Sequence, residues 1–176
     1  EMSEQLGLLD FENGIDVSLS SLLKNQIKEI EKQIELTIKE DLELHKQYQL
    51  VKSVPGVGKV LSWNLLVKTN AFKKCRDPRK LACFCGVAPF SFQSGTSINR
   101  RPKVSVYADK NLKSILHMGA MSAIKTDEQL REYYLRKVAE GKNKMSVLNA
   151  IRNKILHRIV AVIRNQKMYQ PNLHLS

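Results

Sequence analysis

The stretch that decides the fold is Ser53-Val-Pro-Gly-Val-Gly-Lys-Val-Leu-Ser-Trp-Asn-Leu-Leu66. An apolar helix end, a short turn with two glycines and a second apolar helix from about Lys59 are typical of a helix-hairpin-helix motif. The glycines let the backbone turn tightly and come close to a DNA strand, so that N–H groups opening the second helix can bond a phosphate. Such a contact positions DNA without reading its sequence. The alternative is a glycine-rich turn without a ligand. The residues predicted to make the contact are Gly56, Val57, Gly58 and Lys59, with Val57 plugging between the two helices.

Downstream of this stretch the pattern stays helical. Helices are predicted from Pro78 to Phe84, from about residue 108 to 126, from 127 to 141 and from about 144 to 165. Asp77, Asp109, Asp127 and Glu128 are interpreted as helix starts. The loop of residues 89–106 has mixed β-type residues that can hold a short irregular hairpin. No strand pattern is strong, so the predicted class is all-α.

Upstream, residues 18–52 predict one long helix with a narrow apolar stripe flanked by charges. Such a helix is typical of a coiled coil, and we expect it to join copies of the chain into a homo-oligomer. A long helix packed on its own domain is the alternative. The stripe residues are Leu23, Ile27, Ile30, Ile34, Ile38 and Leu42. The predicted organisation is a connecting segment (1–17), a coiled-coil dimerisation helix (18–52), a compact helical domain (53–170) and a tail (171–176).

The charge of the chain is high and uneven. The net charge is +12, from 29 Lys+Arg and 17 Asp+Glu. Residues 1–49 hold 5 of the basic and 11 of the acidic side chains, a net charge of −6. Residues 50–176 hold the remaining 24 basic and 6 acidic side chains, a net charge of +18. A segment this basic repels itself unless a polyanion neutralises it, and nucleic acid is the usual polyanion. A merely solvated basic surface is the alternative.

Other features exclude function classes. The three cysteines, Cys75, Cys83 and Cys85, match no common zinc spacing, so no metal site is predicted, and their odd number indicates reduced thiols in the cytoplasm. No apolar run approaches the roughly 20 residues that a membrane span needs. Aromatic residues make up 6% of the chain, which argues against single-strand binding by base stacking.

Residues 86–101 combine hydroxyl groups with paired guanidinium groups. A serine beside fixed cations suits attack on a phosphodiester, because the hydroxyl supplies the attacking oxygen and the cations stabilise charge on the phosphate oxygens. A Ser-Gly pair alone is usually just a turn. The candidate nucleophile is Ser94, with Thr96 and Ser97 as rivals. The candidate phosphate-binding residues are Gly95, Thr96, Ser97, Arg100, Arg101 and Lys103.

Three motifs, taken in order, carry a family resemblance. They are Val54-Pro-Gly-Val-Gly58, Leu81-Ala-Cys-Phe-Cys-Gly-Val-Ala-Pro89 and Ser94-Gly-Thr-Ser-Ile98, with later support from residues 111–113 and 142–144. Over residues 50–165 the chain resembles the C-terminal half of the DEDD-type transposases of bacterial insertion sequences, which are relatives of the Piv-type DNA invertases. Each motif alone is weak, but the ordered set is specific.

The resemblance implies a two-part enzyme. An N-terminal RuvC-like domain holds divalent metal (magnesium) on four acidic residues, and a coiled-coil linker leads to the C-terminal domain. There the serine of the Ser-Gly motif, Ser94 in this chain, forms a transient phosphoserine link to cut DNA. The resemblance also implies a guide RNA that pairs with donor and target DNA. The acidic half is absent here, so we expect a fragment that needs no cofactor of its own and does not cut double-stranded DNA alone.

Two alternatives remain open at this level. The chain can be a non-catalytic helix-hairpin-helix module that clamps DNA and recruits a nuclease, in which case Ser94→Ala functions normally. It can also bind structured RNA by shape. Salt dependence does not separate these classes, because every phosphate contact weakens with salt. A covalent protein–DNA adduct does.

Overall fold

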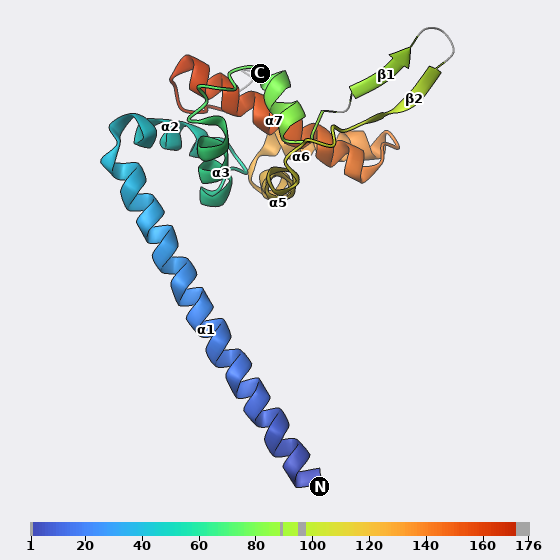
Figure 1. Ribbon diagram of the computed structural model, residues 1–176. Helices are drawn as coiled ribbons and strands as arrows, with labels where there is room; N and C mark the ends of the chain where they lie inside the picture. The colour runs from blue at the N-terminus through green and yellow to red at the C-terminus, as the bar shows by residue number, and fades with distance from the viewer. Residues whose placement is uncertain (1, 89, 95–97, 172–176) are drawn as a thin grey trace. The chain divides into compact units, whose positions relative to one another are not determined.

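The structure, a computed structural model, describes residues 2–88, 90–94 and 98–171, with side chains for 17–88 and 104–171. The helices found there are α1 (Met2–Glu40), α2 (Leu42–Lys52), α3 (Lys59–Thr69), α4 (Pro78–Phe84), α5 (Lys110–Thr126), α6 (Glu128–Ala139) and α7 (Lys144–Asn165) (Figure 1). The strands are β1 (Phe90–Ser94) and β2 (Ile98–Lys103). The predicted all-α class is confirmed, with one small hairpin added. The chain divides into two compact units, Glu1–His45 and Lys46–Ser176.

The long N-terminal helix differs from its prediction at both ends. It begins at Met2 rather than near residue 18 and continues through Gly7 and Gly14. Glycine costs a helix about 1 kcal/mol per residue but does not forbid it, as an internal proline would. The helix also does not run unbroken to residue 53. It stops at Glu40, where the Asp41 side chain accepts a hydrogen bond from the Leu44 N–H at 3.0 Å and starts a new helix.

The apolar stripe of α1 is open to solvent from Leu23 to Ile30, whereas Ile34 is half-buried and Ile38 is buried. Leu23, Ile27 and Ile30 are 48%, 55% and 60% exposed. Isolated exposed apolar side chains are common, but a row of them at helical spacing marks a face suited to a partner. Self-association through residues 18–52 therefore stays a prediction with a defined surface.

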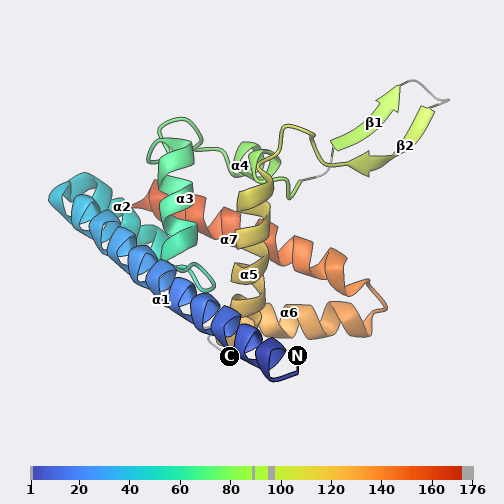
Figure 2. The same cartoon turned by 60° about the horizontal axis from the view of Figure 1, so that its bottom comes forward.

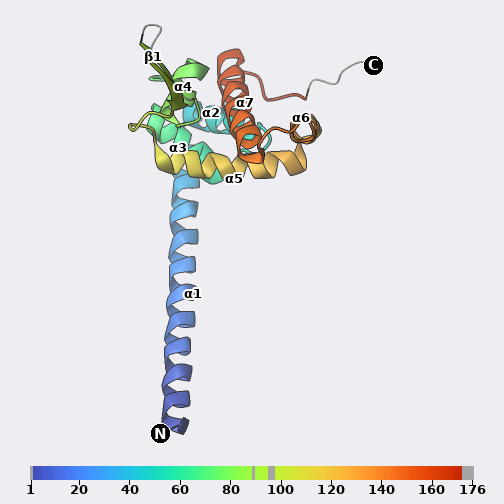
Figure 3. The same cartoon turned by 90° about the vertical axis from the view of Figure 1, so that its right-hand side faces the viewer.

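The core of the second unit is built around α5 and α7, which cross each other (Figures 2 and 3). α7 also packs against α4 and α6, and α5 against α3 and α6. The predicted apolar faces are confirmed, because they are buried along both helices. The buried apolar side chains of α7 are Val147, Leu148, Ile151, Ile155, Leu156, Ile159, Val160 and Val162, and those of α5 include Leu112, Leu116, Ala120 and Ala123.

Side-chain caps set the helix starts, as predicted. Asp77, Asp109 and Asp127 accept hydrogen bonds from Arg79 N–H, Leu112 N–H and Leu130 N–H at 2.8 to 2.9 Å and so begin α4, α5 and α6. Asn143 does the same for α7. Each cap satisfies an otherwise unpaired donor and typically stabilises the helix by about 1 kcal/mol.

The loop between α4 and α5 holds the predicted short hairpin. β1 and β2 are antiparallel, with Ser94 opposite Ile98, Phe92 opposite Arg100 and Phe90 opposite Lys103. Between the last two pairs β2 carries one extra residue, which makes a bulge. Pro102 lies in this bulged part of β2, and proline suits such a position because it has no N–H for the ladder.

Candidate nucleic-acid interface

The turn between α2 and α3 is held tightly against α5. Val57 is 6% exposed, and its N–H donates to Val54 O at 3.0 Å, so the residue predicted to plug between the helices is buried. Gly56 has φ +83°, and a Cβ placed there would lie 2.4 Å from Gly119 O and 2.6 Å from Ala123 Cβ. Gly56 is therefore required for packing as well as for backbone conformation. The close approach seen here is to the backbone of α5, and the predicted approach of Gly56 to a DNA strand stays a prediction.

Gly58 differs from Gly56 in every one of these respects. It lies at the N-cap of α3 with φ −89° and ψ 179°, is exposed, and has open space around the position of a Cβ. No side chain caps this helix end, and its first turn holds no acidic residue. Lys59 and Val60 are exposed next to it. An uncapped helix start without carboxylates is the local arrangement that suits a phosphate oxygen.

Ser94 ends β1 at the tip of the hairpin, directly before the connection to β2. Arg100 and Lys103 are placed along the opposing strand, and Arg101 lies between them in the bulged stretch. The hairpin therefore brings the predicted nucleophile and the predicted cations into one small element. Gly95, Thr96 and Ser97 lie outside the described residues, as do the side chains of Ser94, Arg100, Arg101 and Lys103.

Four of the six carboxylates of the second unit cap helices or pair with cations, namely Asp77, Asp109, Asp127 and Glu140. Asp109 pairs with Lys68, Asp127 with Arg158 at 2.7 Å, and Glu140 with Lys137 at 2.7 Å. Burial disfavours the charged form of Asp109, yet hydrogen bonds from Lys68 and from the Leu112 N–H hold its pKa below the ordinary value. Because these carboxylates cap helices or form ion pairs, most Lys and Arg side chains of the second unit have no carboxylate that neutralises them, and their charge can attract an anionic partner.

Metal binding finds no support in the described part of the chain. No group of three or more His, Cys, Asp or Glu side chains that could hold an ion occurs there. The thiols are free, and Cys85 is buried, which raises its pKa to about 12. A thiol with so high a pKa is a poor metal ligand and a poor nucleophile near neutral pH. The magnesium that the family resemblance implies does not fit the residues described.

Two arginines of α7 have roles that the sequence pattern missed. Arg158 donates a hydrogen bond to Asp127, and its guanidinium group lies 4.7 Å from the Tyr169 ring centroid. Arg152 is 6% exposed, its Nε has no hydrogen-bond partner, and burial lowers its pKa. The only sequence signal for Arg152 is its spacing, which places it on the same face as Leu148 and Leu156.

The basic helical domain, with its glycine turn packed against α5 and its hairpin between α4 and α5, has the features of a known protein family. Residues 48–135, half of the chain, match the family described as "Transposase IS116/IS110/IS902 family". The chain belongs to this transposase family. The matched segment includes both the turn at 55–58 and the hairpin, and it ends within α6.

Relatives of the same kind extend the similarity beyond that segment. The chain is 28% identical over 151 residues to the pilin gene-inverting protein of Moraxella bovis, covering 85% of this chain and 47% of the relative. It is 28% identical over 135 residues to the uncharacterized 42 kDa protein of insertion element IS900 from Mycobacterium paratuberculosis, covering 76% and 34%. It is 26% identical over 176 residues to the uncharacterized 43.6 kDa protein of insertion element IS110 from Streptomyces coelicolor, covering 98% and 43%. The chain thus spans less than half the length of these relatives.

Within the described residues, no helix combines the length and the apolar character needed to cross a bilayer.

Proposed function

We propose that this chain is the DNA-binding, serine-bearing C-terminal domain of an insertion-sequence transposase or recombinase that cuts and rejoins DNA through a transient phosphoserine link on Ser94. The family match supports the class of enzyme. The observation that carries the serine assignment is the position of Ser94 at a hairpin tip, with Arg100 on the opposing strand. The cytoplasm is the expected compartment, since that is where the chromosomal DNA of a bacterium lies.

Each proposed step exchanges one phosphate ester bond for another, so the reaction needs no nucleotide cofactor as an energy source. The Ser94 oxygen attacks a phosphodiester phosphorus, a Ser–O–P bond forms, and the bond from phosphorus to one deoxyribose oxygen breaks. The proton of the serine passes to a base, and the released deoxyribose oxygen takes up a proton. A hydroxyl of another strand then attacks the phosphoserine in the reverse sense and frees Ser94. Arg100, Arg101 and Lys103 stabilise charge on the phosphate oxygens in both steps.

A second contact is proposed at the turn of residues 55–58, acting as a helix-hairpin-helix motif. The start of α3 supports it, because Gly58 and Lys59 are exposed, the helix end lacks a side-chain cap, and its first turn has no carboxylate. Backbone N–H groups there can bond a DNA phosphate. This contact holds DNA without reading its sequence.

Three further parts of the proposal concern partners and rest on the family resemblance. We expect an acidic DEDD-type nuclease domain to supply the magnesium site, since the described residues offer none. We expect a guide RNA to select the DNA. We also expect the exposed stripe of α1 to join copies of the protein, since Leu23, Ile27 and Ile30 lie open at coiled-coil spacing.

The test uses the full-length protein of the gene with labelled element-end DNA, RNA transcribed from the flanking region and magnesium. Denaturing gels then report a covalent protein–DNA adduct. The proposal predicts an adduct in the wild type, its loss in Ser94→Ala, and its persistence in the control Ser114→Ala, which changes an exposed serine of α5. Undiminished recombination by Ser94→Ala would overturn the serine assignment and favour the non-catalytic helix-hairpin-helix alternative.

A further inference from the structure

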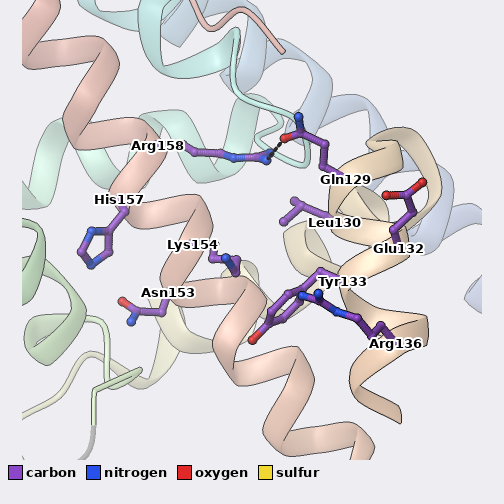
Figure 4. Close-up of a pocket in the computed structure, with 9 residues that line it drawn as sticks. All are labelled: Gln129, Leu130, Glu132, Tyr133, Arg136, Asn153, Lys154, His157 and Arg158. Atoms are coloured by element: carbon purple, nitrogen blue, oxygen red, sulfur yellow. Dashed lines mark hydrogen bonds between the residues drawn. The ribbon is translucent and has the colours of Figure 1, made fainter. Parts of the chain in front are cut away.

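A groove of about 830 Å³ lies between α6 and α7 (Figure 4). Its α6 wall includes Tyr133 and Arg136, and its α7 wall includes Lys154 and His157. The α7 wall lies beyond the segment that matches the transposase family. The groove is also distinct from the turn at 55–58, which packs against Gly119 and Ala123 of α5.

Two cations of this groove are exposed and have no carboxylate partner. Among the described residues no Asp or Glu oxygen lies within 4.0 Å of Lys154 or Arg136. Lys154 Nζ instead lies 4.5 Å from the centroid of the Tyr133 ring, and Figure 4 shows the two side chains against each other. The ring covers one side of the ammonium group, so the N–H donors on the other side stay available to a ligand. Arg158 is the contrast, since Asp127 and Gln129 already bind its guanidinium group.

The surroundings leave these charges unneutralised. Glu132 is the one carboxylate among the groove-lining residues. Near the groove, Asp127 is paired with Arg158 and Glu140 with Lys137, and Glu128 at the start of α6 is not among the lining residues. Positive side chains that are held apart from carboxylates beside an aromatic ring are the usual elements of a nucleic-acid backbone contact. The volume is in the range of sites that enclose a small-molecule-sized group, roughly 300–1,000 Å³.

We propose that the α6–α7 groove binds a phosphodiester segment of nucleic acid, with Arg136 and Lys154 on the phosphates. This inference rests on the proposed function, since it gives the recombinase domain a second backbone contact away from the Ser94 hairpin. The ligand chemistry is the same for DNA and RNA, and the test separates the two sources. An acidic peptide is the competing occupant, and it predicts no effect of groove variants on nucleic-acid binding.

The experiment measures binding of the 176-residue chain to a labelled DNA duplex and to a labelled RNA hairpin over a range of salt. The groove variant is Arg136→Gln with Lys154→Gln. The matched control is Lys144→Gln with Arg164→Gln, which removes the same charge from exposed positions of α7 outside the groove lining. A second variant, Arg136→Lys with Lys154→Arg, keeps the charge.

The groove variant is expected to bind at least one probe about 10- to 50-fold more weakly at 0.15 M salt, with a log–log salt slope lower by about two. The control and the charge-keeping variant should stay within about threefold of the wild type. The probe that loses affinity identifies DNA, RNA or both as the source of the phosphates. Equal losses in the groove and control variants, or no loss in either, would overturn the proposal.

This result is separable from the fate of the serine chemistry. If the groove variant loses binding and the wild type forms no adduct, the phosphoserine proposal fails and the groove proposal stands. A Ser94-dependent adduct together with unchanged binding by the groove variant would do the reverse.

Discussion

Replacement of Gly56 by alanine should destabilise the second unit, and the size of the effect follows from two separate costs. The residue has φ +83°, a conformation that costs an L-residue about 1–2 kcal/mol. The new Cβ would also lie 2.4 Å from the backbone oxygen of Gly119, and relief of such overpacking costs about 1–3 kcal/mol. The expected total is about 2–5 kcal/mol, a large share of the stability of a typical domain.

Three other glycines separate the two costs. Gly141 has φ +81° with open space around it, so Gly141→Ala should show the conformational cost alone. Gly119 lies inside α5, where a Cβ would come 2.6 Å from Gly56 O, so Gly119→Ala should show the packing cost, reduced by the better helix propensity of alanine. Gly58→Ala meets neither cost and should change the stability by less than about 1 kcal/mol.

Urea denaturation of the chain, followed by circular dichroism, measures all four variants. The midpoints should fall most for Gly56→Ala, with the m-value unchanged. A Gly56→Ala chain within 1 kcal/mol of the wild type would refute the packing account. So would a Gly58→Ala chain as unstable as Gly56→Ala. The same ranking decides how binding data are interpreted, because lost DNA binding in Gly56→Ala then reports an altered fold rather than a lost contact.

Four further outcomes are expected. Gly58→Asp should cap α3 and keep the stability, yet it should lower DNA affinity at least tenfold, because its carboxylate repels a phosphate at that helix end. Gly58→Ser should keep both the stability and the DNA affinity. Thermal melts measure the stability, and anisotropy titrations measure the affinity. Asp109→Asn should lower the free energy of unfolding near pH 7, because hydrogen bonds in the folded state lower the Asp109 pKa. The stability that Asp109 contributes is present above its unfolded-state pKa of about 3.9 and is lost as the pH falls through the folded-state pKa. Urea melts of the wild type and the variant should therefore converge in acid. Arg152→Met should leave the stability unchanged or raise it, because the buried guanidinium has an unpaired Nε, and a loss above about 1 kcal/mol in a thermal melt would contradict this. Ile27→Asp should abolish self-association seen by light scattering, and an unchanged mass would place the contact elsewhere.

Local signals in the sequence predict most of the helices. Asp77, Asp109 and Asp127 act through residues two or three positions away, so their capping role can be read along the chain. The apolar spacing of α7 predicts its buried face for the same reason. The break at Asp41 carried a local signal as well, an N-cap residue, but it was obscured by an apolar spacing that continues across it.

Contacts between distant residues could not be predicted in this way. Nothing near Gly56 in the sequence indicates that Gly119 lies against it, and nothing near Arg158 points to Asp127 as its partner. The candidate groove shows the same limit, because Tyr133 and Lys154 meet only through the packing of α6 on α7. For the hairpin, the hydroxyl and arginine residues could be predicted as a group, but their register required the structure.

The most direct test of the central claim is to identify the residue that carries DNA in the adduct. The adduct formed by the full-length protein would be digested with nuclease and protease, and the modified peptide sequenced by mass spectrometry. The account predicts a nucleotide joined through phosphate to Ser94. A nucleotide on Thr96, on Ser97 or outside this chain would contradict it.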